Sequence, residues 1–141
     1  MSYTLGSKSL SNLVGVHPEL GFAVVEAIKI TRQDFTAFDG VRNLSEQEAI
    51  YGSGASKTMD SYHLYGLAVD LVPWIGGKAR WEEDPCRVVG IAMTDIIKAH
   101  GLAIEWGWDI WGWDGWHYQM TGYKDRYDIR EFNQHVAIGG N

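Results

Sequence analysis

Several features that are common in other protein classes are scarce in this 141-residue chain. It has a single cysteine, Cys86, which excludes an internal disulfide. No apolar run approaches the roughly 20 residues that a membrane-spanning helix needs. Lysine and arginine number 12 against 18 acidic residues, a net charge of −6, and no basic run indicates a nucleic-acid footprint. We therefore expect neither a membrane nor a nucleic acid as partner.

The amino-terminal residues 1–16 lack a basic segment followed by an apolar one. That pattern marks secretory signal peptides, so we expect the chain to be made and held in the cytoplasm. The length suits about one domain with a core of its own. Glycine and tryptophan are abundant instead, and five of the 7 tryptophans fall within residues 106–116.

Hydrophobic periodicity and capping residues predict three helices, over residues 17–30, 43–52 and 84–100. Proline suits the start of a helix because its ring fixes the backbone angle that the first turn requires. In the third helix, Asp84 is the expected N-cap and Gly101 the expected C-terminal stop. These two residues make the third helix the clearest expectation in the chain.

Alternation and short apolar runs predict extended segments at four places: 34–41, 66–74, 102–109 and 116–120. The second is expected to stop at Pro73, and a turn at Gly76 and Gly77 follows it. The strands meet through loops rather than through regular helical crossovers. This arrangement favours an α+β fold over a doubly wound sheet.

The stretch SYHLYGLAVDL, residues 61–71, places an acid, Asp70, inside a segment that otherwise reads as a buried strand. An ionised carboxylate there is unfavourable unless it is paired or bound to a metal. His63 lies seven residues earlier, and Gly66 lets the chain turn that imidazole back. His117 starts the last strand after a glycine turn. Two nitrogens and one oxygen make three protein ligands, the number that a catalytic zinc takes beside water.

Hydrolysis at such a site also needs a base that removes a proton from water. Asp114 lies three residues before His117, and Gly115 between them permits a tight bend. Asp109 is a weaker candidate for the base and is expected to be structural. The alternative for His63 and Asp70 is a buried hydrogen-bonded pair without metal. The tryptophan cluster likewise fits either core packing or the lining of a binding groove.

Taken together, SYHLYGLAVDL and the downstream WDGWHYQ resemble the S-x-H-x-x-G-x-A-x-D … D-x-x-H signature of the VanY-like zinc peptidases. That family includes D,D- and L,D-carboxypeptidases and phage L-alanyl-D-glutamate peptidases. The resemblance covers roughly residues 3–120. The segments GVHPEL, GASKTMDSYHL and IEWGWD are most similar to the phage endolysins of the group.

The resemblance implies a single α+β domain of the Hedgehog/D-Ala-D-Ala-peptidase type, with a small antiparallel sheet and packed helices. We expect it to span residues 1–141, with a core at about 3–120 and a tail, 121–141, of unknown role. The motif matches assign the metal ligands and the catalytic carboxylate: His63, Asp70 and His117 for one Zn²⁺ per chain, and Asp114 for catalysis.

Three further matches fall on the substrate site of the family. Arg42 corresponds to an arginine that holds a substrate carboxylate, Gln47 to a polar residue of the same cleft, and Ser61 to the serine heading the motif. Without the family, Arg42 and Gln47 would read as a polar surface pair at a helix start. The chain departs from the family at three positions that carry no ligand and bear on subsite preference: Tyr62, Leu67 and Trp116.

The function implied is that of a zinc-dependent endolysin, which hydrolyses the L-alanyl-D-glutamate bond of the peptidoglycan stem peptide and causes host lysis. Such an enzyme waits in the host cytoplasm and acts on the cell wall once a separate membrane-permeabilising protein has opened the membrane. We expect a monomer. Two alternatives remain at this point: a D-alanyl-D-alanine carboxypeptidase or dipeptidase with the same site, and a non-catalytic wall-binding module.

Overall fold

The structure, a computed structural model, describes residues 2–41, 46, 48–49, 52–53 and 62–122. The expected helix at 43–52 and the tail beyond residue 122 lie largely or wholly outside these ranges. The described residues form a small α+β domain, which confirms the fold class predicted from the sequence.

An antiparallel sheet with the strand order β1-β2-β5-β4 forms one layer of the domain. Strand β3 pairs with the far end of β2 through a two-residue turn at Gly76 and Gly77. Both glycines have positive φ, 61° and 77°, as a tight hairpin turn of this kind requires. The strand bounds are Phe35–Asp39 for β1, Ala68–Ile75 for β2, Lys78–Ala79 for β3, Ile104–Trp106 for β4 and His117–Met120 for β5.

The prediction that the second strand stops at Pro73 is wrong, because β2 continues to Ile75. Strand β5 pairs with β2 only as far as Asp70, so Pro73 lies where no β5 residue needs its missing N–H. The carbonyl oxygen of Pro73 still accepts a hydrogen bond from the backbone N–H of Arg80, at 2.8 Å. Proline is therefore compatible with this part of the strand.

Two longer helices confirm the sequence prediction, α2 (Pro18–Ile30) and α4 (Glu83–His100). Helix α4 ends at Gly101 in a left-handed conformation, as expected. Its N-cap is Glu82, so the assignment of Asp84 as cap is wrong. Asp84 instead lies in the first turn, where a negative charge is favourable beside the free N–H groups of the helix.

The sequence did not predict the two short helices α1 (Ser7–Asn12) and α5 (Gly107–Trp111). At six and five residues they are too short to show a repeating apolar face. Helix α5 begins at Gly107, inside the segment 102–109 that was expected to be extended, and continues to Trp111. A further helical element among the described residues is a 3₁₀ turn, η1 (Tyr62–Tyr65), which lies just before β2.

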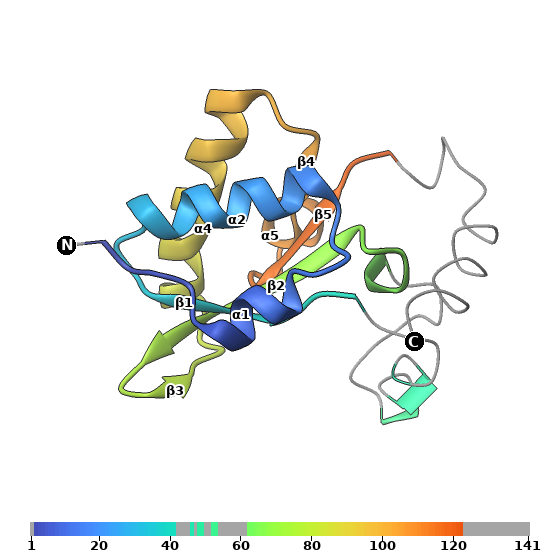
Figure 1. The fold of residues 1–141 in the computed structure, drawn as a ribbon, viewed down its shortest axis with the longest axis horizontal. Coiled ribbons are helices and arrows are strands. Elements are labelled where there is room, and N and C mark those ends of the chain that lie inside the picture. Colours follow the sequence, from blue (N-terminus) through green and yellow to red (C-terminus); the bar gives the residue numbers. More distant parts are fainter. Residues whose placement is uncertain (1, 42–45, 47, 50–51, 54–61, 123–141) are drawn as a thin grey trace.

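The two faces of the sheet have different roles. Helices α2 and α4 pack together, and Figure 1 shows them crossing. Side chains alternate along a strand, so the residues that join this core, such as Val69 and Tyr118, leave Asp70 and His117 on the opposite face. The helices thus support the sheet from one side, and the polar residues occupy the other.

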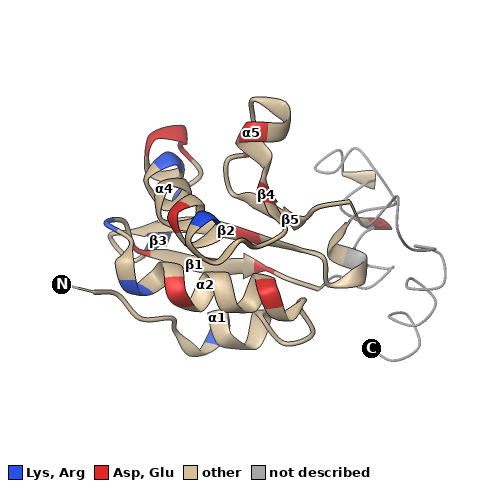
Figure 2. Cartoon of the chain, turned by 90° about the horizontal axis from the view of Figure 1, so that it is seen from above, with Lys and Arg blue, Asp and Glu red and all other residues tan. Residues whose placement is uncertain are grey.

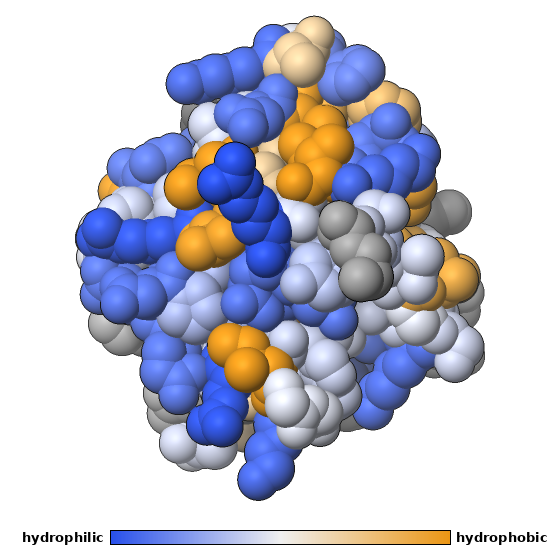
Figure 3. All heavy atoms as spheres, turned by 90° about the vertical axis from the view of Figure 1, so that its left-hand side faces the viewer, coloured by the Kyte–Doolittle hydropathy of each residue, from blue (hydrophilic) through white to orange (hydrophobic). Residues whose placement is uncertain are grey.

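The surface of the described part mixes polar and apolar groups. Figure 2 shows acidic residues on α2, α4, α5 and β4, with lysine and arginine among them on α2 and α4. On the face shown in Figure 3, exposed hydrophobic side chains form small groups separated by hydrophilic ones. Within the described ranges, none of the helices has the length and apolar character needed to cross a membrane.

Helix α1 is held against β1 by hydrogen bonds from its side chains. Asn12 donates its amide Nδ2–H to the carbonyl oxygen of Ala37 at 2.9 Å, and Ser9 Oγ accepts from the backbone N–H of Ala37 at 3.0 Å. Directly after β1, Gly40 approaches α1 so closely that a Cβ atom there would collide with the backbone carbonyl oxygen of Asn12. A side chain at Gly40 would therefore push the helix and strand apart.

We predict that Gly40→Ala lowers the free energy of unfolding by about 1–3 kcal/mol, since overpacking against backbone cannot relax cheaply. The matched control is Gly21→Ala, in α2, where an added Cβ meets nothing within 4 Å. That variant should gain up to about 1 kcal/mol from better helix propensity. Urea unfolding of both proteins checks this, and equal effects would contradict the packing described.

Candidate metal centre and active site

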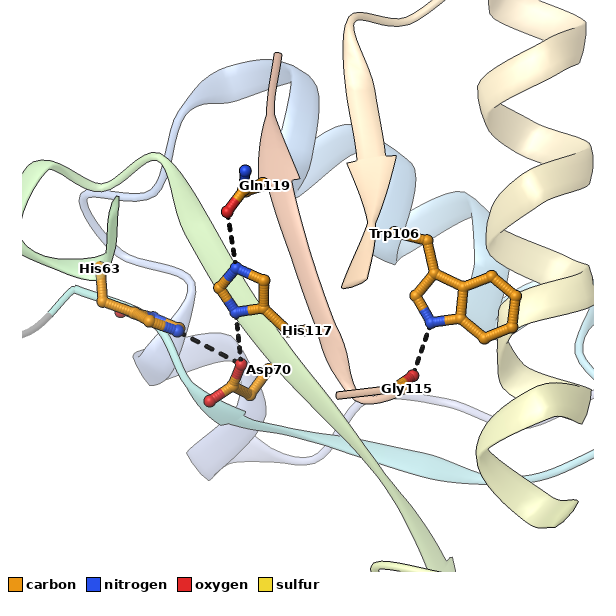
Figure 4. A network of polar contacts seen from close by, with 7 residues as sticks. His63, Asp70, Trp106, Gly115, His117 and Gln119 are labelled. Carbon is orange, nitrogen blue, oxygen red and sulfur yellow. Dashed lines mark hydrogen bonds and ion pairs between the residues drawn. The ribbon is translucent and has the colours of Figure 1, made fainter. Parts of the chain in front are cut away.

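Three separate elements bring His63, Asp70 and His117 together. Asp70 on β2 and His117 on β5 are direct partners in the antiparallel pairing of these strands. His63 comes from η1, and the chain turns into β2 at Gly66, which has a φ of 69°. Gly66 is tightly placed, because a Cβ atom there would collide with the carbonyl oxygen of Gly15. Figure 4 shows both imidazole rings directed at the Asp70 carboxylate.

The distances define one compact cluster. Nε2 of His63 lies 3.2 Å from Oδ1 of Asp70, and Nδ1 of His117 lies 3.1 Å from the same oxygen. One ligand atom from each residue falls within 4.8 Å of the others. The three side chains are buried, at 2%, 6% and 8% exposure respectively. The sequence therefore predicted correctly which residues meet in space.

The remaining nitrogen of each imidazole faces an oxygen acceptor outside the cluster. Nδ1 of His63 donates to the carbonyl oxygen of Gly40 at 2.8 Å. Nε2 of His117 donates to Oε1 of Gln119 at 2.9 Å, as Figure 4 shows. A carbonyl oxygen can only accept, so each outward nitrogen carries hydrogen. Metal-binding histidines characteristically have such an outer acceptor, which leaves the inward nitrogen to the metal.

The donor set also fits zinc in its chemistry. Two imidazole nitrogens and one carboxylate oxygen form a three-ligand set of the kind found at catalytic zinc sites, which keep a further position for reaction. All three residues are buried, so a carboxylate without a cationic partner would be unfavourable there. The cluster could therefore hold a metal ion.

The electrostatics of the cluster show how strongly its members interact. Burial would raise the pKa of Asp70, but attraction to His63 and hydrogen bonds from His117 and His63 lower it well below its ordinary value. For His117, burial lowers the pKa, but the hydrogen bond with Asp70 and its negative charge raise it. The net pKa of His117 lies above its ordinary value. The lowered pKa favours the ionised form of Asp70. Its negative charge then favours a positively charged group at the centre of the cluster.

Asp114, the expected catalytic carboxylate, lies in the turn that leads into β5. Its φ of 61° is left-handed, a conformation that is rare outside glycine and that collects at functional sites. Its backbone carbonyl oxygen accepts a hydrogen bond from the N–H of His117 at 3.1 Å. The negative charge of Asp114 contributes to the raised pKa of His117, which places the carboxylate within electrostatic reach. Asp109 is exposed in the first turn of α5.

The predicted substrate-binding residues Arg42, Gln47 and Ser61 lie outside the described residues, and their roles stay predictions. The structure adds two contacts that sequence reasoning missed, the carbonyl of Gly40 and the side chain of Gln119. Gln119 carried a usable signal, since it lies two residues after His117 on a strand and so shares its face. A backbone carbonyl such as that of Gly40 gives no signal in a sequence.

The tryptophans include both residues that pack against the core and residues that are exposed, the two alternatives that the sequence left open. Trp106 is half-buried and packs against the core, where it stacks on Tyr118 with a centroid distance of 6.2 Å and donates to the carbonyl oxygen of Gly115 at 2.6 Å. Trp111 is exposed, and its ring centroid lies 5.6 Å from that of His117. Trp113, also exposed, lies next to Trp111 at 6.0 Å. Two exposed aromatic rings therefore lie beside the cluster, next to His117.

The fold and the buried His–Asp–His cluster are compatible with a metallopeptidase, and comparison with known proteins gives the family. A family model described as phage L-alanyl-D-glutamate peptidase matches residues 1–132. The chain belongs to this family, which confirms the resemblance found in the sequence motifs.

Individual relatives agree with the family assignment. The L-alanyl-D-glutamate peptidase of Escherichia phage T5 is 30% identical over 113 residues, 77% of this chain and 82% of that protein. That of Listeria phage A118 is 36% identical over 77 residues, which are 51% of this chain and 25% of that protein. The crystal structure of Serratia marcescens L-Ala D-Glu endopeptidase ChiX superposes with a TM-score of 0.75, at 30% identity and 94% coverage of each chain.

Proposed function

We propose that this protein is a zinc-dependent endolysin that hydrolyses the L-alanyl-D-glutamate bond of the peptidoglycan stem peptide. The observation that carries the proposal is the convergence of His63, Asp70 and His117 in one buried cluster beside Asp114. The names of the relatives supply the bond, since the T5 and A118 proteins are both L-alanyl-D-glutamate peptidases.

In this proposal His63, Asp70 and His117 hold one zinc ion per chain. When bound, zinc supplies Lewis acidity toward the scissile carbonyl and makes water more acidic. The chain's own part is to fix the ligand geometry: Gly40 and Gln119 hold the outward nitrogens of the two histidines, and Asp70 supplies the negative charge.

Asp114 is the proposed general base and acid. It takes a proton from the attacking water and later delivers that proton to the leaving amine of D-glutamate. The backbone of Asp114 is fixed next to β5 by its left-handed turn and by the hydrogen bond that its carbonyl oxygen accepts from His117. The left-handed conformation is uncommon outside glycine, although aspartate adopts it more readily than most residues, and such positions gather at functional sites.

Substrate binding is proposed for Arg42, Gln47 and Ser61 from their motif positions. An arginine can hold a carboxylate with two parallel hydrogen bonds, and the free α-carboxylate of D-glutamate lies beside the scissile bond. The exposed Trp111 and Trp113 supply an aromatic border along which an extended peptide can lie.

The wider setting is also a proposal. Residues 1–141 form one zinc peptidase domain, with its core at about 3–120 and a tail of unassigned role. The protein acts as a monomer on the cell wall, and it reaches the wall from the host cytoplasm after a separate protein has permeabilised the membrane.

The bond specificity is tested by mass analysis of fragments released from purified peptidoglycan. We expect free stem peptides that begin with D-glutamate, and glycan strands that keep L-alanine. Release of D-alanine from a pentapeptide stem, with the alanyl-glutamate bond intact, would show a carboxypeptidase instead. No release at all from a zinc-loaded protein would favour a wall-binding module.

The role of Asp114 is tested by Asp114→Asn, which keeps the size of the side chain and removes its basicity. We expect hydrolysis to fall by about 10²–10⁴-fold, the usual contribution of a general acid–base group. Zinc content should stay at the wild-type level. Asp109→Asn, on the exposed side of α5, is the matched control and should retain activity. A loss confined to Asp109→Asn would reverse the assignment.

A further inference from the structure

A polar row crosses the face of the sheet that carries the metal cluster. It runs over three neighbouring strands, from Asp70 on β2, through His117 and Gln119 on β5, to Glu105 on β4. Asp70 lies directly opposite His117, and Glu105 lies directly opposite Gln119. In Figure 4, Gln119 lies on the side of the His117 ring away from Asp70.

The hydrogen bonds along this row have a single consistent direction. The amide Nε2–H of Gln119 donates to Oε1 of Glu105 at 2.8 Å, because an ionised carboxylate can only accept. The amide oxygen of Gln119 is then left facing His117, whose Nε2 lies 2.9 Å away and must donate. The remaining nitrogen, Nδ1, points at the cluster, 3.1 Å from Asp70.

Comparison with His63 shows why the amide of Gln119, next to His117, needs a partner that fixes its orientation. The outer acceptor of His63 is the backbone carbonyl oxygen of Gly40. This oxygen can only accept a hydrogen bond, so it always favours hydrogen on the outward nitrogen of His63. A glutamine side chain can rotate and offer its amide N–H₂ in place of its oxygen. Such a turn would favour hydrogen on Nδ1 of His117 and block that atom as a ligand.

We propose that Glu105 and Gln119 are positioning residues that select Nδ1 of His117 as the metal-ligating atom. The inference rests on the proposed zinc function. Glu105 fixes the orientation of the Gln119 amide, and Gln119 fixes which ring nitrogen of His117 carries hydrogen. Gln119 is buried, at 9% exposure, so a turned amide would lose a partner in a place where water cannot easily replace it.

The experiment uses two variants of Gln119 and an exchange of the pair. Gln119→Leu removes the acceptor of His117. Gln119→Glu keeps an acceptor but sets two carboxylates against each other across a 2.8 Å contact. The exchange variant, E105Q/Q119E, places the carboxylate beside His117 and the amide donor on β4, so the direction of the row is restored. Gln33→Leu, which removes amide bonds of 2.9 Å and 3.2 Å to two backbone carbonyls, is the matched control for lost packing.

The readouts are the zinc dissociation constant, measured by chelator competition, and the visible absorption spectrum of the Co²⁺-substituted protein. We expect Gln119→Leu to weaken zinc binding by about 10–100-fold, as loss of an outer partner of a ligand does, and to change the Co²⁺ spectrum. Gln119→Glu should also bind zinc more weakly. The exchange should recover affinity and spectrum to near wild type, and Gln33→Leu should leave both unchanged.

Wild-type zinc affinity and spectrum in Gln119→Leu would overturn the inference. So would an exchange variant that binds zinc no better than Gln119→Glu, and this second comparison decides the matter if Gln119→Leu does not fold. Failure of the wild-type protein to bind zinc would overturn the proposed function instead, which keeps the two claims distinguishable.

Discussion

The structure depends on one interaction, the contact of a buried carboxylate, Asp70, with two imidazole rings. A charge in that position requires partners of opposite sign or a metal, because burial penalises the ionised form. His63 and His117 meet this requirement from two different elements, at 3.2 and 3.1 Å. The pairing of β2 with β5 and the turn at Gly66 are the parts of the fold that make these contacts geometrically possible.

Two further backbone features lie beside the same cluster. Asp114 adopts a left-handed conformation, and Gly40 approaches α1 so closely that no side chain fits there. The core formed by α2, α4 and the apolar face of the sheet holds the strands in register while these features persist. The division of the sheet into an apolar and a polar face thus separates stability from chemistry.

The sequence was sufficient for the features that depend on local pattern. The periodicity of α2 and α4 and the alternation in β1 and β5 are properties of single segments, and the two motifs identified the cluster. The sequence was insufficient where the outcome depends on distant partners: Pro73 is tolerated because β5 stops pairing earlier, and the contact of Gln119 with Glu105 exists only because β4 and β5 are neighbours. The short α1 and α5 offer too few residues for a periodic signal.

The central claim is that the cluster of His63, Asp70 and His117 is a zinc site on which hydrolysis depends. The most direct test is the metal content of the protein purified without chelator, measured together with peptidoglycan hydrolysis before and after exhaustive chelation. The account predicts one zinc per chain, loss of hydrolysis with loss of the metal, and recovery when zinc is returned. Full hydrolysis by the metal-free protein would contradict it.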